Sequence, residues 1–275
     1  MTKNPTSSLK ARIFSALVLI PVAAGAAWAG GVAFASLCAL AGILIGWEWS
    51  RLFFDNQDKR NYLSLWIGTG AIFVAMLSYL APLFLLPVFG ILFFVPLVPL
   101  FVKESRILPA FGGIYAAFPV AALVLFRNDP QHGLWAIIWI FGIVWATDIA
   151  AYFTGKSIGG PKLSPRWSPN KTWSGLLGGV GAAALTGAFV AFALGNTSVP
   201  ILAALSGGLA IVAQIGDIFE SSLKRRAGVK DSSQIIPGHG GVMDRLDGLI
   251  AASSLALAIG IMRGGMHAAK GVLIW

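Results

Sequence analysis

Ionisable residues gather in one stretch of the chain, from Gly216 to Gly248. The sequence has 11 acidic and 20 basic residues, and this stretch holds five of each kind: Asp217, Glu220, Asp231, Asp244 and Asp247, with Lys224, Arg225, Arg226, Lys230 and Arg245. The segments on both sides of it are apolar. Because an ionisable group in an apolar, membrane-embedded helix is costly, such a cluster predicts a functional site.

The acids are spaced so that they share helical faces. Four polar residues stand at positions i, i+3, i+4 and i+7, on one face of a helix: Asp217, Glu220, Ser221 and Lys224. Asp244 and Asp247 share a face of the following helix. Two helix ends could therefore present carboxylates to one cavity that faces the cytoplasm. Carboxylates without cysteine, and with one histidine nearby, favour Mg²⁺ over zinc or copper.

The segment between those two helices contains donors for anions. Gly238, Gly240 and Gly241 let the backbone approach a ligand at the start of the second helix, and helix N-termini attract anions. Acids for a divalent cation beside bases and backbone donors for phosphate are the components of phosphoryl or nucleotidyl transfer. The alternative is a set of ion pairs that only braces two helix ends.

A second polar segment begins at Asp148, near the cytoplasmic end of an apolar helix, where a carboxylate needs a cation or a donor nearby. The loop that follows carries four bases and no acid: Lys156, Lys162, Arg166 and Lys171. Gly159, Gly160 and Pro161 allow turns that expose backbone N–H groups, and hydroxyls follow at Ser164, Ser168 and Thr172. This combination suits a polyphosphate, but a solvated cytoplasmic loop would be basic as well.

The elements that must position these residues are apolar helices. With 275 residues, 57% hydrophobic, and a mean hydropathy of +0.79, the chain is predicted to be an all-α polytopic integral membrane protein. We expect about nine transmembrane helices, near 12–29, 31–54, 62–80, 83–101, 107–126, 133–154, 174–194, 200–222 and 244–262. The first is expected to be a retained helix rather than a cleaved signal peptide. They form one membrane domain over 1–275, with hydrophobic helices at 12–126 and catalytic helices and loops at 133–262.

The basic residues predict the orientation of the chain. With a cytoplasmic N-terminus, every Lys and Arg except Arg127, Arg263 and Lys270 falls on the cytoplasmic side. The positive-inside rule therefore predicts an N-in, C-out topology. This distribution explains most of the net charge of +9 without a nucleic-acid partner.

Three polar residues outside these segments are interpreted as structural. Glu48 stands between two tryptophans that suit a membrane interface, and it could pair with Arg51; a role in binding substrate is the alternative. His132 and His267 lie in terminal or extracytoplasmic segments with no partner at ligand spacing, and both are expected to be solvated.

Two motifs carry a resemblance to a known family. The segment from Ser221 to Asp247, SSLKRRAGVKDSSQIIPGHGGVMDRLD, resembles the hallmark of the phosphatidate cytidylyltransferases, or CDP-diacylglycerol synthases. The segment from Asp148 to Gly175, with its Ser-Pro and Ser-Pro-x-Lys-Thr core, resembles a second loop of that family. The resemblance implies an all-helical membrane enzyme, a homodimer, in the bacterial inner membrane with its active site facing the cytoplasm. It implies that CTP and phosphatidic acid, a membrane lipid, are joined into CDP-diacylglycerol with release of pyrophosphate, and that Mg²⁺ is required.

The resemblance also assigns residues. Asp217 and Asp244 would be the metal ligands, and Glu220 and Asp247 are further candidates from spacing. The catalytic polar centre would comprise Lys224, Arg225, Lys230, Asp231, His239 and Arg245. Candidates for substrate binding are Asp148, Lys156, Lys162, Ser164, Ser168, Lys171, Thr172 and Ser221. We expect Lys224, Arg225 and Lys230 to neutralise the lipid phosphate and the departing pyrophosphate, and Lys156, Lys162 and Lys171 to hold outer phosphates or the lipid head group. His239 either donates to a phosphate or caps the glycine-rich loop.

Two other functions are weighed against this one. A CDP-alcohol phosphatidyltransferase is also membrane-bound and Mg²⁺-dependent, but its aspartate array continues onto the next helix. Here the sequence after Gly248 is LIAASSLALAIG, without a further acid. A secondary transporter would place its charges along an ion path between inverted repeats, whereas these charges lie at predicted cytoplasmic helix ends and no inverted repeat is apparent.

Overall fold

The computed structural model describes residues 5–85, 88, 91, 108–195 and 198–275. These residues fold almost entirely into helices, and their contacts divide the chain into two compact units. Unit 1 combines Met1–Val124 with Arg226–Leu246, and unit 2 combines Leu125–Arg225 with Asp247–Trp275. The chain thus passes from unit 1 into unit 2, returns to unit 1 for residues 226–246, and ends in unit 2.

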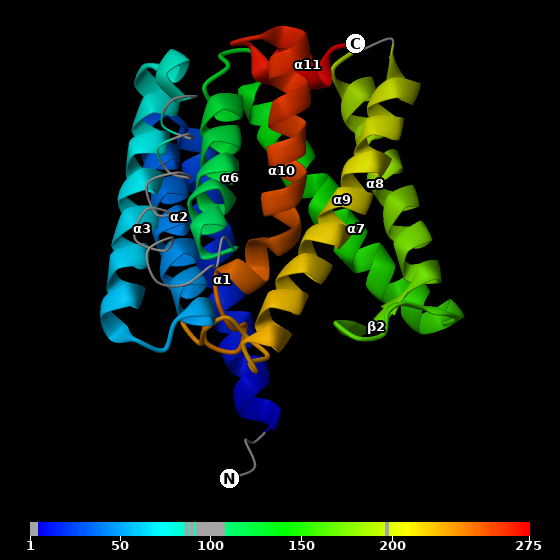
Figure 1. Cartoon of the computed structure of the whole chain (residues 1–275). Helices are drawn as coiled ribbons and strands as arrows, with labels where there is room; N and C mark the ends of the chain where they lie inside the picture. The colour runs from blue at the N-terminus through cyan, green and yellow to red at the C-terminus, as the bar shows by residue number, and fades with distance from the viewer. Residues whose placement is uncertain (1–4, 86–87, 89–90, 92–107, 196–197) are drawn as a thin grey trace. The chain divides into compact units, whose positions relative to one another are not determined.

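Unit 1 is built around two long helices that pack side by side (Figure 1). Its elements are α1 (Pro5–Ala29), α2 (Gly31–Phe53), α3 (Gln57–Leu80), η1 (Pro82–Phe84), η2 (Leu108–Ala110) and most of α6 (Phe111–Arg127). Glycine lets α2 approach α3 closely, because a Cβ added at Gly46 would lie 2.6 Å from Ile67 Cγ2. The start of α3 is capped by the Asn56 side chain, which accepts a hydrogen bond from the Lys59 N–H at 3.0 Å.

Trp49 fixes α2 against η2 and α6. Its indole is fully buried, its Nε1 donates to the Pro109 carbonyl at 3.0 Å, and its ring lies 4.8 Å from that of Tyr115. The sequence-based interpretation of Trp49 as an interfacial anchor is therefore wrong: an indole N–H that finds a buried acceptor is a packing element here.

Unit 2 contains the second half of the chain (Figure 1). Its elements are α7 (Gly133–Ile158), β1 (Lys162–Ser164), β2 (Ser168–Thr172), α8 (Trp173–Ala193), α9 (Val199–Arg226), α10 (Met243–Gly264) and α11 (Ala268–Leu273); the first four residues of α10 belong to unit 1. β1 and β2 pair antiparallel, so the basic loop forms a short hairpin. Small residues bring α8 and α9 together: a Cβ at Gly187 would lie 2.7 Å from the Leu202 carbonyl oxygen.

Among the residues that the structure describes, seven helices are long and apolar enough to cross a membrane: Gly31–Phe53, Gln57–Leu80, Leu108–Arg127, Gly133–Ile158, Trp173–Ala193, Val199–Arg226 and Met243–Gly264. They confirm the all-α class and seven of the predicted spans as apolar helices. The predicted span at 12–29 lies in α1, where the shorter apolar helix Leu17–Ala29 is described. The predicted span at 83–101 lies almost wholly outside the described residues. Nine spans, the N-in, C-out topology and a single domain stay predictions.

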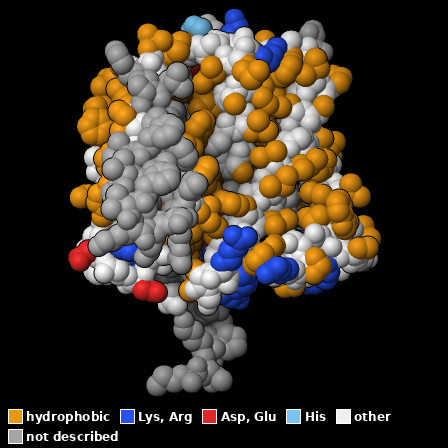
Figure 2. All heavy atoms as spheres, in the orientation of Figure 1, with side chains coloured by type: hydrophobic (Ala, Val, Ile, Leu, Met, Phe, Trp, Pro, Cys, Tyr) orange, Lys and Arg blue, Asp and Glu red, His pale blue; other side chains and the backbone are white. Residues whose placement is uncertain are grey.

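Large apolar side chains are exposed along these helices, as expected where lipid rather than water surrounds them (Figure 2). In unit 2 they include Trp145, Ile149, Tyr152 and Phe153 of α7 and Leu177, Leu185, Phe189 and Phe192 of α8.

Candidate active site

A group of polar side chains from four elements meets within unit 2. We call it the carboxylate cluster: Asp148 of α7, Lys171 of β2, Gln214 and Asp217 of α9, and Asp247 of α10. Lys171 is at its centre, with Nζ 2.5 Å from Asp217 Oδ2 and 2.8 Å from Gln214 Oε1, to which it donates. Gln214 Nε2 in turn donates to Asp148 Oδ1 at 3.3 Å. The amide of Gln214 therefore links the ammonium of Lys171 to the carboxylate of Asp148.

The cluster carries more negative than positive charge. Asp217 and Asp148 repel the carboxylate of Asp247 electrostatically, whereas Lys171 attracts it. Asp247 Oδ1 also accepts the Gly248 N–H at 2.6 Å. Three carboxylates near one ammonium attract a further cation. Because the atoms that could coordinate it are oxygens, a hard cation such as Mg²⁺ would suit them best.

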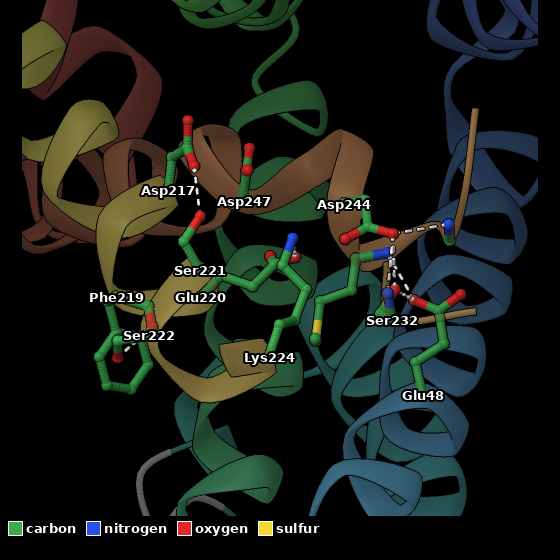
Figure 3. A network of polar contacts seen from close by, with 12 residues as sticks. Glu48, Asp217, Phe219, Glu220, Ser221, Ser222, Lys224, Ser232, Asp244 and Asp247 are labelled. Carbon is green, nitrogen blue, oxygen red and sulfur yellow. Dashed lines mark hydrogen bonds and ion pairs between the residues drawn. The ribbon is translucent and has the colours of Figure 1, made fainter. Parts of the chain in front are cut away.

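Close packing of α9 on α10 brings two of these acids together. Gly216 makes it possible, because an added Cβ would lie 2.6 Å from Ala251 Cβ and 2.9 Å from the Asp247 carbonyl oxygen. Asp217 follows Gly216 directly, so its carboxylate projects beside the crossing point. Ser221, one turn later, donates to Asp217 Oδ1 at 3.3 Å (Figure 3). The predicted shared face of Asp217 and Ser221 is thereby confirmed.

Glu220 and Lys224 form a second, buried pair on α9. Lys224 Nζ lies 3.1 Å from Glu220 Oε1, the i,i+4 contact expected on a helix (Figure 3). Glu220 is 0% exposed and Lys224 8% exposed. The ammonium of Lys224 thus balances the charge of the buried Glu220 carboxylate. Both of these predicted site residues are engaged with each other in the structure.

Residues 227–242 form the loop between α9 and α10, which we call the signature loop. Asp244 anchors this loop within unit 1. Asp244 Oδ2 accepts from the Ser232 N–H at 2.9 Å, the Ser232 hydroxyl at 3.1 Å and the Gly241 N–H at 2.8 Å (Figure 3). A carboxylate at the start of a helix that accepts backbone N–H groups is an effective cap. Asp244 thus holds the fold of the loop in addition to any contact with ligand.

Glu48 of α2 is a second acid at this helix start. It is 0% exposed and accepts four hydrogen bonds: from the hydroxyls of Ser232 (3.0 Å) and Ser233 (2.6 Å) and from the N–H groups of Val242 (2.8 Å) and Met243 (2.7 Å). The predicted pairing of Glu48 with Arg51 is wrong, since Arg51 lies over the Trp47 ring instead, at 4.5 Å.

The glycine-rich turn of the signature loop is folded by backbone contacts. The N–H of Ile236 donates to the Gly240 carbonyl at 2.9 Å, and Gly240 has a φ of +87°, which favours glycine. The Ser15 hydroxyl of α1 donates to the Pro237 carbonyl at 3.0 Å. The N–H groups of residues 241–243 donate to Asp244 and Glu48, so the predicted phosphate site at the N-terminus of α10 does not form from these donors here.

Of the other predicted residues in the signature region, several are at the surface. His239 is half-buried in the glycine-rich turn, and the exposed residues are Arg225, Lys230, Asp231 and Arg245. Exposed bases at this position can reach an anionic ligand, in line with the predicted role of Arg225 and Lys230 in neutralising phosphates.

In the basic hairpin, the predicted residues have different surroundings. Lys171 joins the carboxylate cluster, whereas Lys156 lies over the Tyr152 ring at 5.5 Å and Lys162 is exposed. Ser164 and Ser168 face each other across the hairpin. The Thr172 side chain accepts the Gly175 N–H at 3.1 Å, and so caps α8.

The predicted metal pair spans the two units. Asp217 belongs to unit 2 and Asp244 to unit 1, so their approach to a common ion stays a prediction. Among the residues that the structure describes, no three His, Cys, Asp or Glu side chains form a ready-made metal cluster. Gln214 is the member of the carboxylate cluster that the sequence analysis missed. A polar residue three positions before Asp217 in an otherwise apolar helix was the available signal.

The two histidines predicted to be solvated both approach one carboxylate in unit 2. His132 Nδ1 lies 3.4 Å from Asp129 Oδ1, and His267 Nδ1 lies 3.9 Å from Asp129 Oδ2. His267 is largely exposed, whereas the side chain of Asp129 is 6% exposed. The expected solvation is therefore confirmed for His267, whereas it is wrong for His132, whose side chain is only 18% exposed.

Comparison with known proteins adds to this geometry. A family model described as the cytidylyltransferase family matches residues 10–261. A phosphatidate cytidylyltransferase of Brucella suis is 42% identical over 261 residues, which cover 92% of this chain and 94% of the relative. The protein of that name from Pseudomonas aeruginosa is 35% identical over 265 residues, which cover 91% and 96%. The protein of that name from Haemophilus influenzae is 40% identical over 162 residues, which cover 57% and 55%.

Proposed function

Because the chain belongs to the cytidylyltransferase family, we propose that it transfers the cytidylyl group of CTP to phosphatidic acid, forming CDP-diacylglycerol and pyrophosphate. The single observation that carries this proposal is the similarity to phosphatidate cytidylyltransferases over more than nine-tenths of both chains. That similarity includes both polar motifs and the helices between them.

The reaction exchanges one phosphorus–oxygen bond for another. An oxygen of the phosphatidic acid phosphate forms a bond to the α-phosphorus of CTP, while the bond from that phosphorus to the bridging oxygen of the β-phosphate breaks. Pyrophosphate leaves with the electron pair. A phosphate monoester is already largely ionised at neutral pH, so the attacking oxygen needs no strong general base. Positioning and charge neutralisation then supply most of the catalysis.

We propose Mg²⁺ as the cofactor. When bound, it would neutralise charge on the CTP phosphates and on the departing pyrophosphate. The carboxylate cluster supports this proposal, because Asp217 and Asp148 both repel Asp247 and a bound divalent cation would relieve that repulsion. In phosphate-transfer sites Mg²⁺ often takes one or two carboxylates and completes its shell with water and substrate phosphates. Asp217 and Asp244 would hold the ion, with Asp247 beside Asp217.

The bases of the chain would bind the anionic groups of both substrates. Lys171 contacts Asp217, so its ammonium stands where a CTP phosphate would meet the carboxylate cluster. Arg225, at the end of α9, and Lys230, in the signature loop, are exposed and would receive the lipid phosphate or pyrophosphate. The buried pair of Glu220 and Lys224 would stabilise the last turns of α9, next to Arg225.

The membrane setting suits a lipid substrate. Seven helices in the described part of the chain are long and apolar enough to cross a bilayer, and the basic residues cluster in segments predicted to be cytoplasmic. We therefore propose a multi-pass protein of the bacterial inner membrane, active as a homodimer, with its site open to cytoplasmic CTP. Phosphatidic acid would enter from the lipid phase.

The test is direct. Purified protein in detergent is incubated with phosphatidic acid, Mg²⁺ and CTP that is labelled at the α-phosphate. We expect label in the lipid fraction and one pyrophosphate for each labelled lipid. If the protein instead releases CMP from CDP-diacylglycerol when an alcohol is added, and forms no labelled lipid from CTP, it is a CDP-alcohol phosphatidyltransferase and the proposal is refuted.

A further inference from the structure

The burial of Glu48 needs an explanation that the proposed reaction does not supply. A carboxylate in the interior of an apolar helix is strongly disfavoured unless hydrogen bonds replace its water. Glu48 has four such bonds, and all of them come from residues 232–243, far along the chain. The two ends of this contact lie in one compact unit. The carboxylate thus binds the signature loop to α2.

Helix α2 is a rigid support for that contact. The next residue, Trp49, is held by the Pro109 carbonyl, and its ring packs so closely on Gly112 that an added Cβ there could not fit. Two residues earlier, Gly46 packs against Ile67 of α3. With packing fixed on both sides, the position of Glu48 is set by the core of unit 1, and the loop must conform to it.

Glu48 and Asp244 are coupled through the residues they share. The Ser232 hydroxyl lies 3.0 Å from Glu48 Oε2 and 3.1 Å from Asp244 Oδ2, so the two carboxylates share its single proton. Gly241 donates to Asp244, and a Cβ added to it would lie 2.5 Å from Glu48 Oε1. A shift of Glu48 therefore moves the partners of Asp244.

We propose that Glu48 is a positioning residue for nucleotidyl transfer: it holds the start of α10 and thereby sets the place and orientation of Asp244. This inference rests on the proposed function, in which Asp244 is a metal ligand. Both carboxylate oxygens of Glu48 accept hydrogen bonds from the loop and the helix start, among them those from the Val242 and Met243 N–H groups, so that α10 begins at one fixed point. A displacement of about 1 Å in a group that positions substrate can lower a rate on the order of 10²-fold.

The test uses two substitutions of Glu48. Glu48→Gln keeps the shape and one acceptor oxygen, but its NH₂ group faces donors and cannot accept from them. We expect kcat for CDP-diacylglycerol formation to fall about 10²-fold, with KM for phosphatidic acid changed less than about threefold. Glu48→Asp keeps the charge one methylene further from the loop, and we expect an intermediate kcat. Ser50→Ala is the control, because Ser50 is equally buried on α2 but donates to the Trp47 carbonyl, away from the loop.

Two further readouts separate positioning from a general loss of stability. Trypsin can cut at the exposed Arg225, Arg226 and Lys230, and we expect Glu48→Gln, but not Ser50→Ala, to accelerate these cuts several-fold in the intact protein. We also expect Glu48→Gln and Ser232→Ala to be non-additive in kcat, because both act through the same contact. Independent effects would multiply.

The outcomes are distinct. If the wild type forms no CDP-diacylglycerol, the proposed function fails, and the trypsin rates still report whether Glu48 holds the loop. If the wild type is active and Glu48→Gln keeps its kcat, the inference is overturned. It is also overturned if activity per folded molecule is unchanged and only the yield of folded protein falls. Should Glu48→Gln not fold at all, Glu48→Asp decides by the same comparison.

Discussion

Two substitutions in the same helix should have opposite consequences, because α9 contains one glycine at a tight crossing and another in open space. At Gly216, an added Cβ would lie 2.6 Å from Ala251 Cβ and 2.9 Å from the Asp247 carbonyl oxygen. At Gly208, apart from its chain neighbours and the nearby backbone of α9 itself, no described heavy atom lies within 4 Å of the added Cβ. Both changes add the same methyl group to the same element, so Gly208→Ala is a matched control for Gly216→Ala.

The expected size follows from these distances. Carbon atoms in contact are normally about 3.5–4.0 Å apart, so Gly216→Ala must separate α9 from α10 by about 1 Å. Overpacking of this kind costs about 1–3 kcal/mol. The separation falls beside Asp217 and Asp247, and a displacement of about 1 Å at a catalytic group lowers the rate roughly 10²-fold. Gly208→Ala should instead stabilise α9 by about 0.5–1 kcal/mol, because alanine loses less backbone entropy than glycine.

Both variants are measured by thermal unfolding in detergent and by the initial rate of CDP-diacylglycerol formation from labelled CTP. We expect Gly216→Ala to unfold at a lower temperature than the wild type and to lose most of its activity, while Gly208→Ala unfolds at a slightly higher temperature and keeps its activity. If Gly216→Ala is as stable and as active as Gly208→Ala, then the close crossing does not position the carboxylate cluster, and the reasoning from packing to site is refuted.

Three further predictions concern the charges. Lys171→Met removes the ion-pair partner of Asp217 and the hydrogen-bond donor to Gln214. We expect kcat/KM, measured from initial rates, to fall about 30-fold, which corresponds to the loss of about 2 kcal/mol from a charged hydrogen bond. An unchanged rate would show that Lys171 is not part of the site. Excess EDTA should abolish activity and Mg²⁺ should restore it, while full activity in EDTA would contradict the proposed cofactor. Asp129→Asn replaces a carboxylate that accepts the Gln131 and His132 N–H groups by a neutral amide, a weaker acceptor. It should lower the unfolding temperature by about 2–4 °C without changing KM for either substrate. A loss of activity without a loss of stability would instead show that this part of unit 2 acts on the reaction.

Local features of the site could be predicted from the sequence. Apolar runs of about 20 residues predict helices because a bilayer requires that length, and seven of them are present as such. Helical spacing likewise predicts contacts one turn apart, and Ser221 with Asp217 and Lys224 with Glu220 are such contacts. These features depend only on neighbours in the same helix.

The contacts that assemble the site could not be predicted in the same way. Glu48 binds residues 232–243, and neither its position between two tryptophans nor its distance from Arg51 carries information about a partner so far along the chain. Lys171 reaches Asp217 because the basic loop folds into a hairpin, and no alternating apolar pattern in its sequence predicts one. Such contacts depend on how the elements pack within each unit: α2 on the signature loop in unit 1, and β2 beside α9 in unit 2. Apolar composition alone does not determine that packing.

The proposed function requires that carboxylates of α9 and α10 together bind a divalent cation with CTP. Titration of the purified protein with Mn²⁺ in the presence of CTP, followed by electron paramagnetic resonance, measures that binding directly. Asp217→Asn and Asp244→Asn should each weaken Mn²⁺ binding at least about tenfold, the equivalent of about 1.4 kcal/mol, while Asp129→Asn leaves it unchanged. Wild-type Mn²⁺ affinity in either of the first two variants would contradict the shared site.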